Sequence, residues 1–195
     1  MLIASHGTEK RKPYSIAGSP EDASSDDCLE LLIGVNDAGQ PGPHLQLTPG
    51  ALVDVEGPLG RFTFPEAPVE QRFLFVAGGT GIAPLRSMFR HSLARGYADV
   101  CVLYSARTPE DFAFAAELQE LARQGRIELR MTVTREADEA WSGARGRIRN
   151  ELLGALVHDP ETLCFICGPR ALVDDMPKML AELGVCRERV RIEEW

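Results

Sequence analysis

A glycine-rich segment, residues 76–84 (VAGGTGIAP), carries the strongest chemical signal in this 195-residue chain. It joins an apolar run at residues 72–77 to a helix pattern that begins near Pro84, which predicts a strand, a tight turn and a helix. Glycine permits positive φ and close approach of a ligand, and a helix N-terminus offers unpaired N–H groups to a diphosphate. The segment lacks the G-x-G-x-x-G spacing, so a turn without a ligand explains the spacing alone about as well.

A second candidate is the C-x-x-C formed by Cys164 and Cys167. This pair could be a thioredoxin-type redox motif or half of a zinc site. The simpler interpretation is that both are structural cysteines buried in a strand. The pair lies in an apolar run, where residues i and i+3 of a strand point to opposite faces. No second cysteine pair completes a metal site, so we predict none. The five cysteines are odd in number and scattered, which favours reduced thiols: Cys28, Cys101, Cys164, Cys167 and Cys186.

Alternating strand and helix signals after residue 70 must position these residues. Strands are predicted at 72–77, 100–104, 127–133, 162–167 and 189–192, and helices at 84–94, 108–123, 147–157 and 170–183. Thr108 is the expected N-cap of the second helix, and Pro177 predicts a kink or a break in the last one. Near-continuous apolar strands between helices imply parallel βαβ units and a sheet covered on both faces. Residues 69–195 are therefore expected to form a doubly wound nucleotide-binding domain with five parallel strands.

Residues 1–68 have a different pattern. Strand candidates at 14–17, 29–35 and 52–56 are separated by clusters of Gly, Pro, Asp and Ser, and no helix of normal length is visible. The proline-containing stretch at 64–68 is the best domain boundary. The fold class expected for the whole chain is thus α/β plus β, with a partial antiparallel β-barrel before the α/β domain.

Composition excludes several classes of protein. The net charge is −8 and the pI is near 5.1, and no run of Lys and Arg builds a positive stripe, so nucleic acid is excluded as a partner. No stretch approaches the roughly 20 apolar residues of a membrane span. The first 15 residues lack the apolar core and cleavage site of a signal peptide. These features lead us to expect a cytoplasmic protein.

Five short motifs occur in an order and spacing that resemble the ferredoxin–NADP reductase superfamily, which includes the reductase components of bacterial oxygenases. They are PYS (residues 13–15), GPLGRF (57–62), GGTGIAP (78–84), CGP (167–169) and the terminal EEW (193–195). The resemblance covers nearly the whole chain. It implies a flavin-binding antiparallel barrel before the nucleotide-binding domain, with hydride passing between nicotinamide and flavin where the domains meet. Because the chain has no four-cysteine pattern for an iron–sulfur cluster, electrons would pass to a separate ferredoxin, an oxygenase component or a small oxidant.

The resemblance also assigns roles to residues. Tyr14 would lie against the flavin ring, Ser15 near its reactive nitrogen, and Cys167 beside the reacting carbon of the nicotinamide. Trp195 would stack on the flavin nucleotide, which favours FAD over FMN. The simpler alternatives are a barrel-wall aromatic for Tyr14 and a core groove for Trp195. The residues expected to bind cofactors are Lys12, Pro13, Tyr14, Ser15, Gly78, Gly79, Thr80, Gly81, Pro84, Ser105, Arg107, Arg135, Arg147, Cys167, Gly168, Pro169 and Trp195.

Three arginines favour NADP(H) over NAD(H). Arg107 follows the second predicted strand, where the adenosine ribose usually sits, and Arg135 and Arg147 follow the third. No acidic residue directly ends the second strand to bind a free 2′-hydroxyl. The alternative is that these arginines form surface ion pairs, which contribute little.

The chain departs from the family pattern in three places. Lys12 stands where the family's flavin motif begins with Arg, and Lys lacks the bidentate fork. Neither Ser nor Thr occurs around residues 42–45, where His44 is either a donor or a loop histidine. Only three barrel strands are visible of about six, so the remainder is expected upstream of Met1. Two alternatives therefore stay open: a truncated, non-catalytic nucleotide-binding module, and a reductase module cut from a longer chain.

Overall fold

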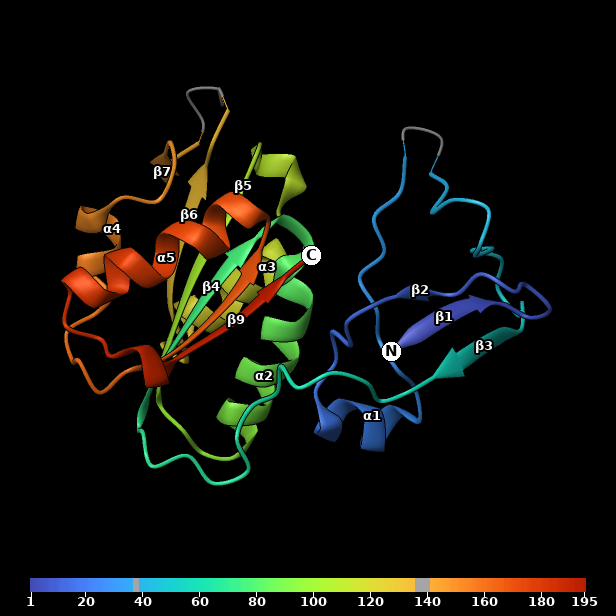
Figure 1. Cartoon of the computed structure of the whole chain (residues 1–195), viewed down its shortest axis with the longest axis horizontal. Helices are drawn as coiled ribbons and strands as arrows, with labels where there is room; N and C mark the ends of the chain where they lie inside the picture. Colours follow the sequence, from blue (N-terminus) through green and yellow to red (C-terminus); the bar gives the residue numbers. More distant parts are fainter. Residues whose placement is uncertain (37–38, 136–140) are drawn as a thin grey trace.

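The computed structural model describes residues 1–36, 39–135 and 141–195, which form a small antiparallel sheet region beside a larger α/β domain (Figure 1). The larger domain contains a sheet of six parallel strands in the order β7-β6-β5-β4-β8-β9. The chain order reverses around β4, since the next strand lies on one side of it and β8 on the other. The strands are β4 Arg72–Gly78, β5 Asp99–Ala106, β6 Glu128–Val133, β7 Ala144–Arg145, β8 Leu163–Gly168 and β9 Val190–Glu194.

Helices cover both faces of this sheet, as expected for a doubly wound domain. Alternate residues of the central strands β4, β5 and β8 enter two separate cores: in β4, Phe73 and Phe75 lie in one, and Leu74 and Val76 in the other. The first core is closed by α2 Ile82–Ala94 and α3 Ala115–Arg123. The second is closed by α4 Asn150–Gly154 and α5 Arg170–Glu182. Burial on both faces explains why these strands are almost continuously apolar in sequence.

Four details of the α/β domain differ from the sequence prediction. The two-residue β7 adds a sixth strand. The helix expected at 108–123 begins as a 3₁₀ turn, Pro109–Asp111, capped by Thr108, and α3 starts only after Phe114, whose φ of 59° interrupts the helix. The helix expected at 147–157 is reduced to α4. α5 continues through Pro177 without a break.

The N-terminal part contains a three-stranded antiparallel sheet in the order β2-β1-β3. These strands are β1 Leu2–Ser5, β2 Lys12–Pro13 and β3 Val53–Glu56. A short helix, α1 Pro20–Asp26, follows Ser19, which forms a capping box with Asp22. An antiparallel sheet of this size fits part of a flavin-binding barrel.

Two of the three strand predictions in this part were wrong. Residues 14–17 and 29–35 meet only at one bridge between Ile16 and Leu31, and β1 was not predicted. The third prediction, at 52–56, is confirmed by β3. No helix in the described part of the chain is long and apolar enough to cross a membrane.

Candidate functional site

The glycine-rich turn packs directly against the carboxyl end of β8. Residues Gly79–Gly81 form a 3₁₀ turn between β4 and α2, with Gly79 at a φ of +55°. A Cβ atom at Gly81 would lie 2.2 Å from the Cys167 carbonyl oxygen, and one at Gly78 would lie 2.8 Å from Pro169. A side chain at either position would force the neighbouring atoms to shift. The turn therefore brings bare backbone to the end of the sheet, where ligands of open α/β folds bind.

Cys167 lies at the end of β8, opposite Ala77 of β4 and Glu193 of β9. Its side chain is buried, and burial, aided by the charge of Glu193, raises the pKa of the Cys167 thiol to about 12. The thiol is therefore neutral at physiological pH. Cys164 belongs to the opposite core, as the strand alternation predicted. The described residues contain no group of three metal ligands.

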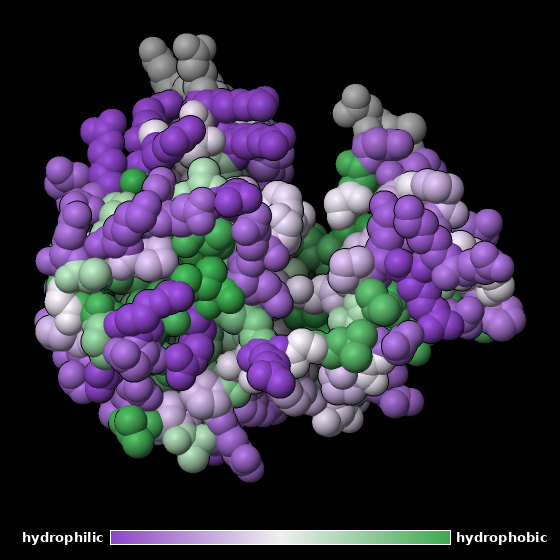
Figure 2. Space-filling view, viewed as in Figure 1, coloured by the Kyte–Doolittle hydropathy of each residue, from purple (hydrophilic) through white to green (hydrophobic). Residues whose placement is uncertain are grey.

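A cavity of about 630 Å³ separates the two parts of the molecule and is visible as the hollow in Figure 2. Ligand sites typically occupy about 300–1,000 Å³. Residues from four separate segments and from α2 line it, among them Pro13, Tyr14, Ser15, Phe62, Phe64, Pro84, Met88, Glu193 and Trp195. The cavity thus joins the PYS motif to the C-terminal tripeptide, which lie 180 residues apart.

A buried histidine orients Tyr14 on the cavity wall. Tyr14 Oη and His44 Nε2 are 2.7 Å apart, and the two rings stack with centroids 5.9 Å apart. Burial and the nearby charge of Lys12 lower the pKa of His44, so its ring is neutral. The Nδ1 atom of His44 is buried without a partner among the described residues. Sequence reasoning considered His44 only as a donor or loop residue, because its contact lies 30 residues away.

Trp195 links the cavity to the glycine-rich turn. Its Nε1 donates a hydrogen bond to the Gly78 carbonyl oxygen at 3.2 Å, and its ring edge lies 3.4 Å from where a Cβ of Gly79 would be. The residue is 59% exposed, so its ring is not held in a core groove. Trp195 therefore forms an open aromatic surface between the two candidate subsites.

The three arginines expected at the 2′-phosphate lie at the carboxyl edge of the sheet, outside the cavity lining. Arg107 and Ser105 belong to the end of β5 and its following loop, and Arg135 follows β6. The Arg135 N–H donates to the Arg107 carbonyl oxygen at 2.9 Å, so two of these loops are joined. Arg147 follows β7, and all three arginines are exposed.

The geometry divides the expected site residues other than Lys12 into three groups. Pro13, Tyr14, Ser15, Pro84 and Trp195 line the cavity. The glycine turn and the CGP motif pack on each other beside it, with Thr80 and Pro169 exposed, and the arginines lie along the strand ends. Lys12 is an exposed residue of β2.

Among the cavity residues to which sequence reasoning gave no role is Glu193, although the EEW tripeptide that contains it was quoted. Burial raises the pKa of Glu193, and its position opposite Cys167 in the β8–β9 pairing brings it to the same end of the sheet. Glu194 lines the cavity as well, and a single sequence could not show either contact because the cavity forms between segments far apart in the chain.

The residues fit both a flavin and a nicotinamide nucleotide. An aromatic cavity of this size suits a conjugated ring, and the glycine-rich turn at the start of α2 suits a diphosphate. Fold and site together define a two-part oxidoreductase that uses a flavin and a nicotinamide nucleotide.

Comparisons with known proteins place the chain within one family. Residues 75–178 match the model of the oxidoreductase NAD-binding domain. The chain is 38% identical over 207 residues to ferredoxin–NADP reductase B of Sorangium cellulosum, covering all of this chain and 82% of that protein. This chain belongs to the ferredoxin–NADP reductase superfamily of FAD-dependent NAD(P)H oxidoreductases.

Other relatives are longer than the chain. An NADPH oxidoreductase of Mycobacterium tuberculosis is 29% identical, and the match covers 97% of this chain and 48% of that protein. Among solved structures, the ferredoxin reductase in carbazole 1,9a-dioxygenase is 25% identical with a TM-score of 0.76, covering 99% of this chain and 58% of the other. The chain thus spans about half the length of these two proteins.

Proposed function

We propose that this chain transfers hydride from NADPH to FAD at the junction of its two parts and passes the electrons to a separate acceptor protein. The observation that carries the proposal is the convergence of three elements: the glycine turn, the end of β8 with Cys167, and the aromatic cavity. Trp195 contacts the turn and lines the cavity. FAD, when bound, supplies an acceptor for two electrons and a source of electrons for the partner.

The residues of the chain then have distinct tasks. Tyr14, held by His44, presents a fixed ring face to the flavin, and Ser15 offers a hydroxyl beside it. The neutral thiol of Cys167, buried at the end of β8, would lie beside the nicotinamide without adding charge. Trp195, which contacts the glycine turn and lines the cavity, would stack on the flavin nucleotide. An aromatic residue at the C-terminus that covers a dinucleotide supports FAD rather than FMN. Mass spectrometry of the cofactor released by heat would identify which flavin is bound.

The proposed preference for NADPH rests on the arginines at the strand ends. A 2′-phosphate carries close to two negative charges, and a hydrogen bond to a charged group contributes about 1.5–3 kcal/mol. Replacing Arg135 by alanine should therefore weaken NADPH binding roughly 10- to 150-fold and leave NADH nearly unchanged. Arg126→Ala is the matched control, since Arg126 is exposed at the opposite end of β6. Equal losses for both nucleotides, or a wild-type preference for NADH, would refute this assignment.

The proposed acceptor is a ferredoxin-like protein or an oxygenase component. The support comes from similarity to the Sorangium ferredoxin–NADP reductase and to the ferredoxin reductase in carbazole dioxygenase. Reduction of purified ferredoxin by NADPH and this chain tests it. The five free cysteines also favour a reducing cytoplasm as the location.

A further inference from the structure

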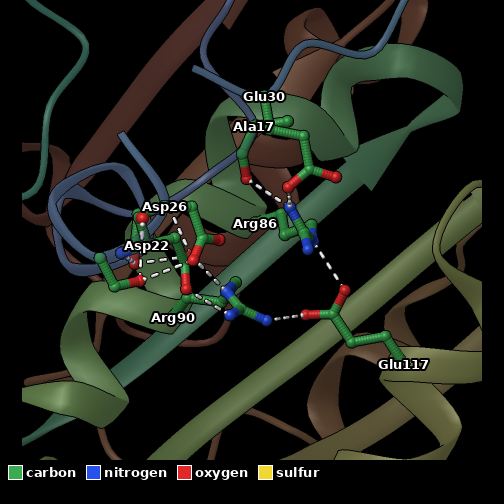
Figure 3. Close-up of polar contacts among 9 residues, drawn as sticks. Ala17, Asp22, Asp26, Glu30, Arg86, Arg90 and Glu117 are labelled. Carbon is green, nitrogen blue, oxygen red and sulfur yellow. Dashed lines mark hydrogen bonds and ion pairs between the residues drawn. The ribbon is translucent and has the colours of Figure 1, made fainter. Parts of the chain in front are cut away.

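Two arginines on α2 join the nucleotide-binding domain to the segment that follows the flavin motif. Arg86 and Arg90 are one helical turn apart, so their side chains leave the same face of the helix. Both contact Glu117 of α3 and both contact acceptors in residues 17–30 (Figure 3). We call this set of contacts the arginine clasp; its members are Ala17, Asp22, Glu30, Arg86, Arg90 and Glu117.

Arg86 is the buried half of the clasp, with a side chain only 8% exposed. Its Nη1 donates to the Ala17 carbonyl oxygen at 2.9 Å and to Glu30 Oε2 at 2.6 Å. Its Nε donates to Glu117 Oε2 at 2.8 Å, and its guanidinium lies 4.2 Å from the centroid of the Phe114 ring. A buried charge is tolerated only with such complete pairing, so removing any partner is costly.

Arg90 is the half-exposed part of the clasp. Its Nε and Nη2 form a bidentate pair with Asp22 at 2.8 and 2.6 Å, and its Nη1 donates to Glu117 Oε1 at 2.6 Å. Hydrogen bonds from Arg90 lower the pKa of Asp22, so the carboxylate stays ionised. Asp22 also closes the capping box of α1 with Ser19, which means that Arg90 holds the helix itself.

The clasped segment is a closed loop that begins two residues after Ser15. The Ala17 N–H donates to the Glu30 carbonyl oxygen at 2.8 Å, and Ile16 bridges Leu31, so the two ends of the loop are joined. Arg86 contacts both ends of it. The helix that carries Arg86 and Arg90, α2, begins directly after the glycine turn. One rigid helix therefore connects the nucleotide-binding turn to the residues that follow Tyr14 and Ser15.

We propose that Arg86 and Arg90 are positioning residues that fix the spacing between the flavin-side residues and the glycine turn. The expected consequence, efficient hydride transfer, rests on the proposed function. The fixed spacing itself is a property of the chain alone. Neither arginine lines the cavity. Their loss should therefore slow transfer without weakening nucleotide binding.

Two native thiols allow the spacing to be measured directly. Cys28 and Cys186 are the exposed cysteines, and they lie on opposite sides of the junction: Cys28 within the clasped loop and Cys186 after α5. Nitroxide labels on these two residues give an interdomain distance distribution by pulsed electron paramagnetic resonance. The measurement needs neither flavin nor nucleotide.

The variants are Arg90→Gln and Arg86→Met, with Arg123→Gln as the matched control. Among the described residues, the side chain of Arg123 pairs with Glu120 of the same helix, α3. We expect one narrow distance distribution for wild type and control, and a broad one for both clasp variants. Arg90→Gln keeps the test valid if Arg86→Met fails to fold, because the Arg90 side chain is 31% exposed.

A second readout separates positioning from simple support of the fold. Flavin reduction in a single turnover should slow by up to about 100-fold in Arg90→Gln, the effect of roughly a 1 Å misplacement, while the Kd for NADPH changes less than threefold. An unchanged distance distribution would overturn the proposal, and so would a broad distribution with wild-type reduction rates. If the wild-type chain reduces no flavin, the proposed function fails, and the distance distributions alone decide on the clasp.

Discussion

Replacing Gly81 by alanine tests how closely the nucleotide-binding turn must approach β8. Gly81 has φ −60° and ψ −10°, which alanine adopts freely, so the change acts through space alone. The new Cβ would lie 2.2 Å from the Cys167 carbonyl oxygen and 2.6 Å from its carbonyl carbon. Both are backbone atoms, so the turn and β8 must separate by about 0.8 Å or more to reach even a 3.0 Å contact.

Overpacking of this kind costs about 1–3 kcal/mol. For a chain of this size the melting temperature should fall by roughly 2–12 °C. The shift moves Cys167 relative to the nicotinamide, so single-turnover flavin reduction should slow by up to about 100-fold. Gly34→Ala is the control, because its Cβ would meet no atom within 4 Å and its φ is not positive. A Gly81→Ala variant with the melting temperature and reduction rate of wild type would refute the close approach.

Three further predictions concern the cysteines. Cys167→Ala should slow hydride transfer while the Kd for NADPH stays within a few-fold, and an unchanged single-turnover rate would remove Cys167 from the reacting centre. Brief alkylation of the native chain should modify Cys28 and Cys186, which are exposed, before the buried Cys101, Cys164 and Cys167; peptide mass spectrometry showing equal modification would contradict the burial. Burial raises the pKa of each of these three thiols from 9.0 to about 12. Their stabilising effect is thus complete below pH 9 and lost as the pH rises towards 12, so urea midpoints should fall between pH 9 and pH 11, more than in a Cys101→Ala variant.

The nucleotide-binding domain was predictable because its strands are buried on both faces. Runs such as residues 72–77 and 162–167 stay apolar throughout, and Gly-rich or capped turns separate them from the helices. The end of α2 and the limits of β4 and β8 were therefore predicted to within about two residues. β7 was not predicted because a strand of two residues shows no hydrophobic periodicity.

The N-terminal part was harder to predict because its strands are short and half exposed. β1 spans four residues at the start of the chain, and its pairing partners lie up to 54 residues away. α1 does carry a local signal, the S-x-x-D spacing of Ser19 and Asp22, which a search for capping boxes would find. The Tyr14–His44 pair and the arginine clasp join residues 27–69 positions apart. Contacts between residues so far apart cannot be predicted from the spacing of residues in a single sequence.

The most direct test of the central claim is an anaerobic visible spectrum of the purified chain, recorded before and after one equivalent of NADPH. The proposed function predicts that the chain carries FAD and that NADPH bleaches its absorbance in a single turnover, faster than NADH at equal, subsaturating concentration. A chain that retains no flavin even when supplied with FAD, or whose bound flavin stays oxidised with excess NADPH, would contradict it. Such a chain would instead be a nucleotide-binding module without reductase activity.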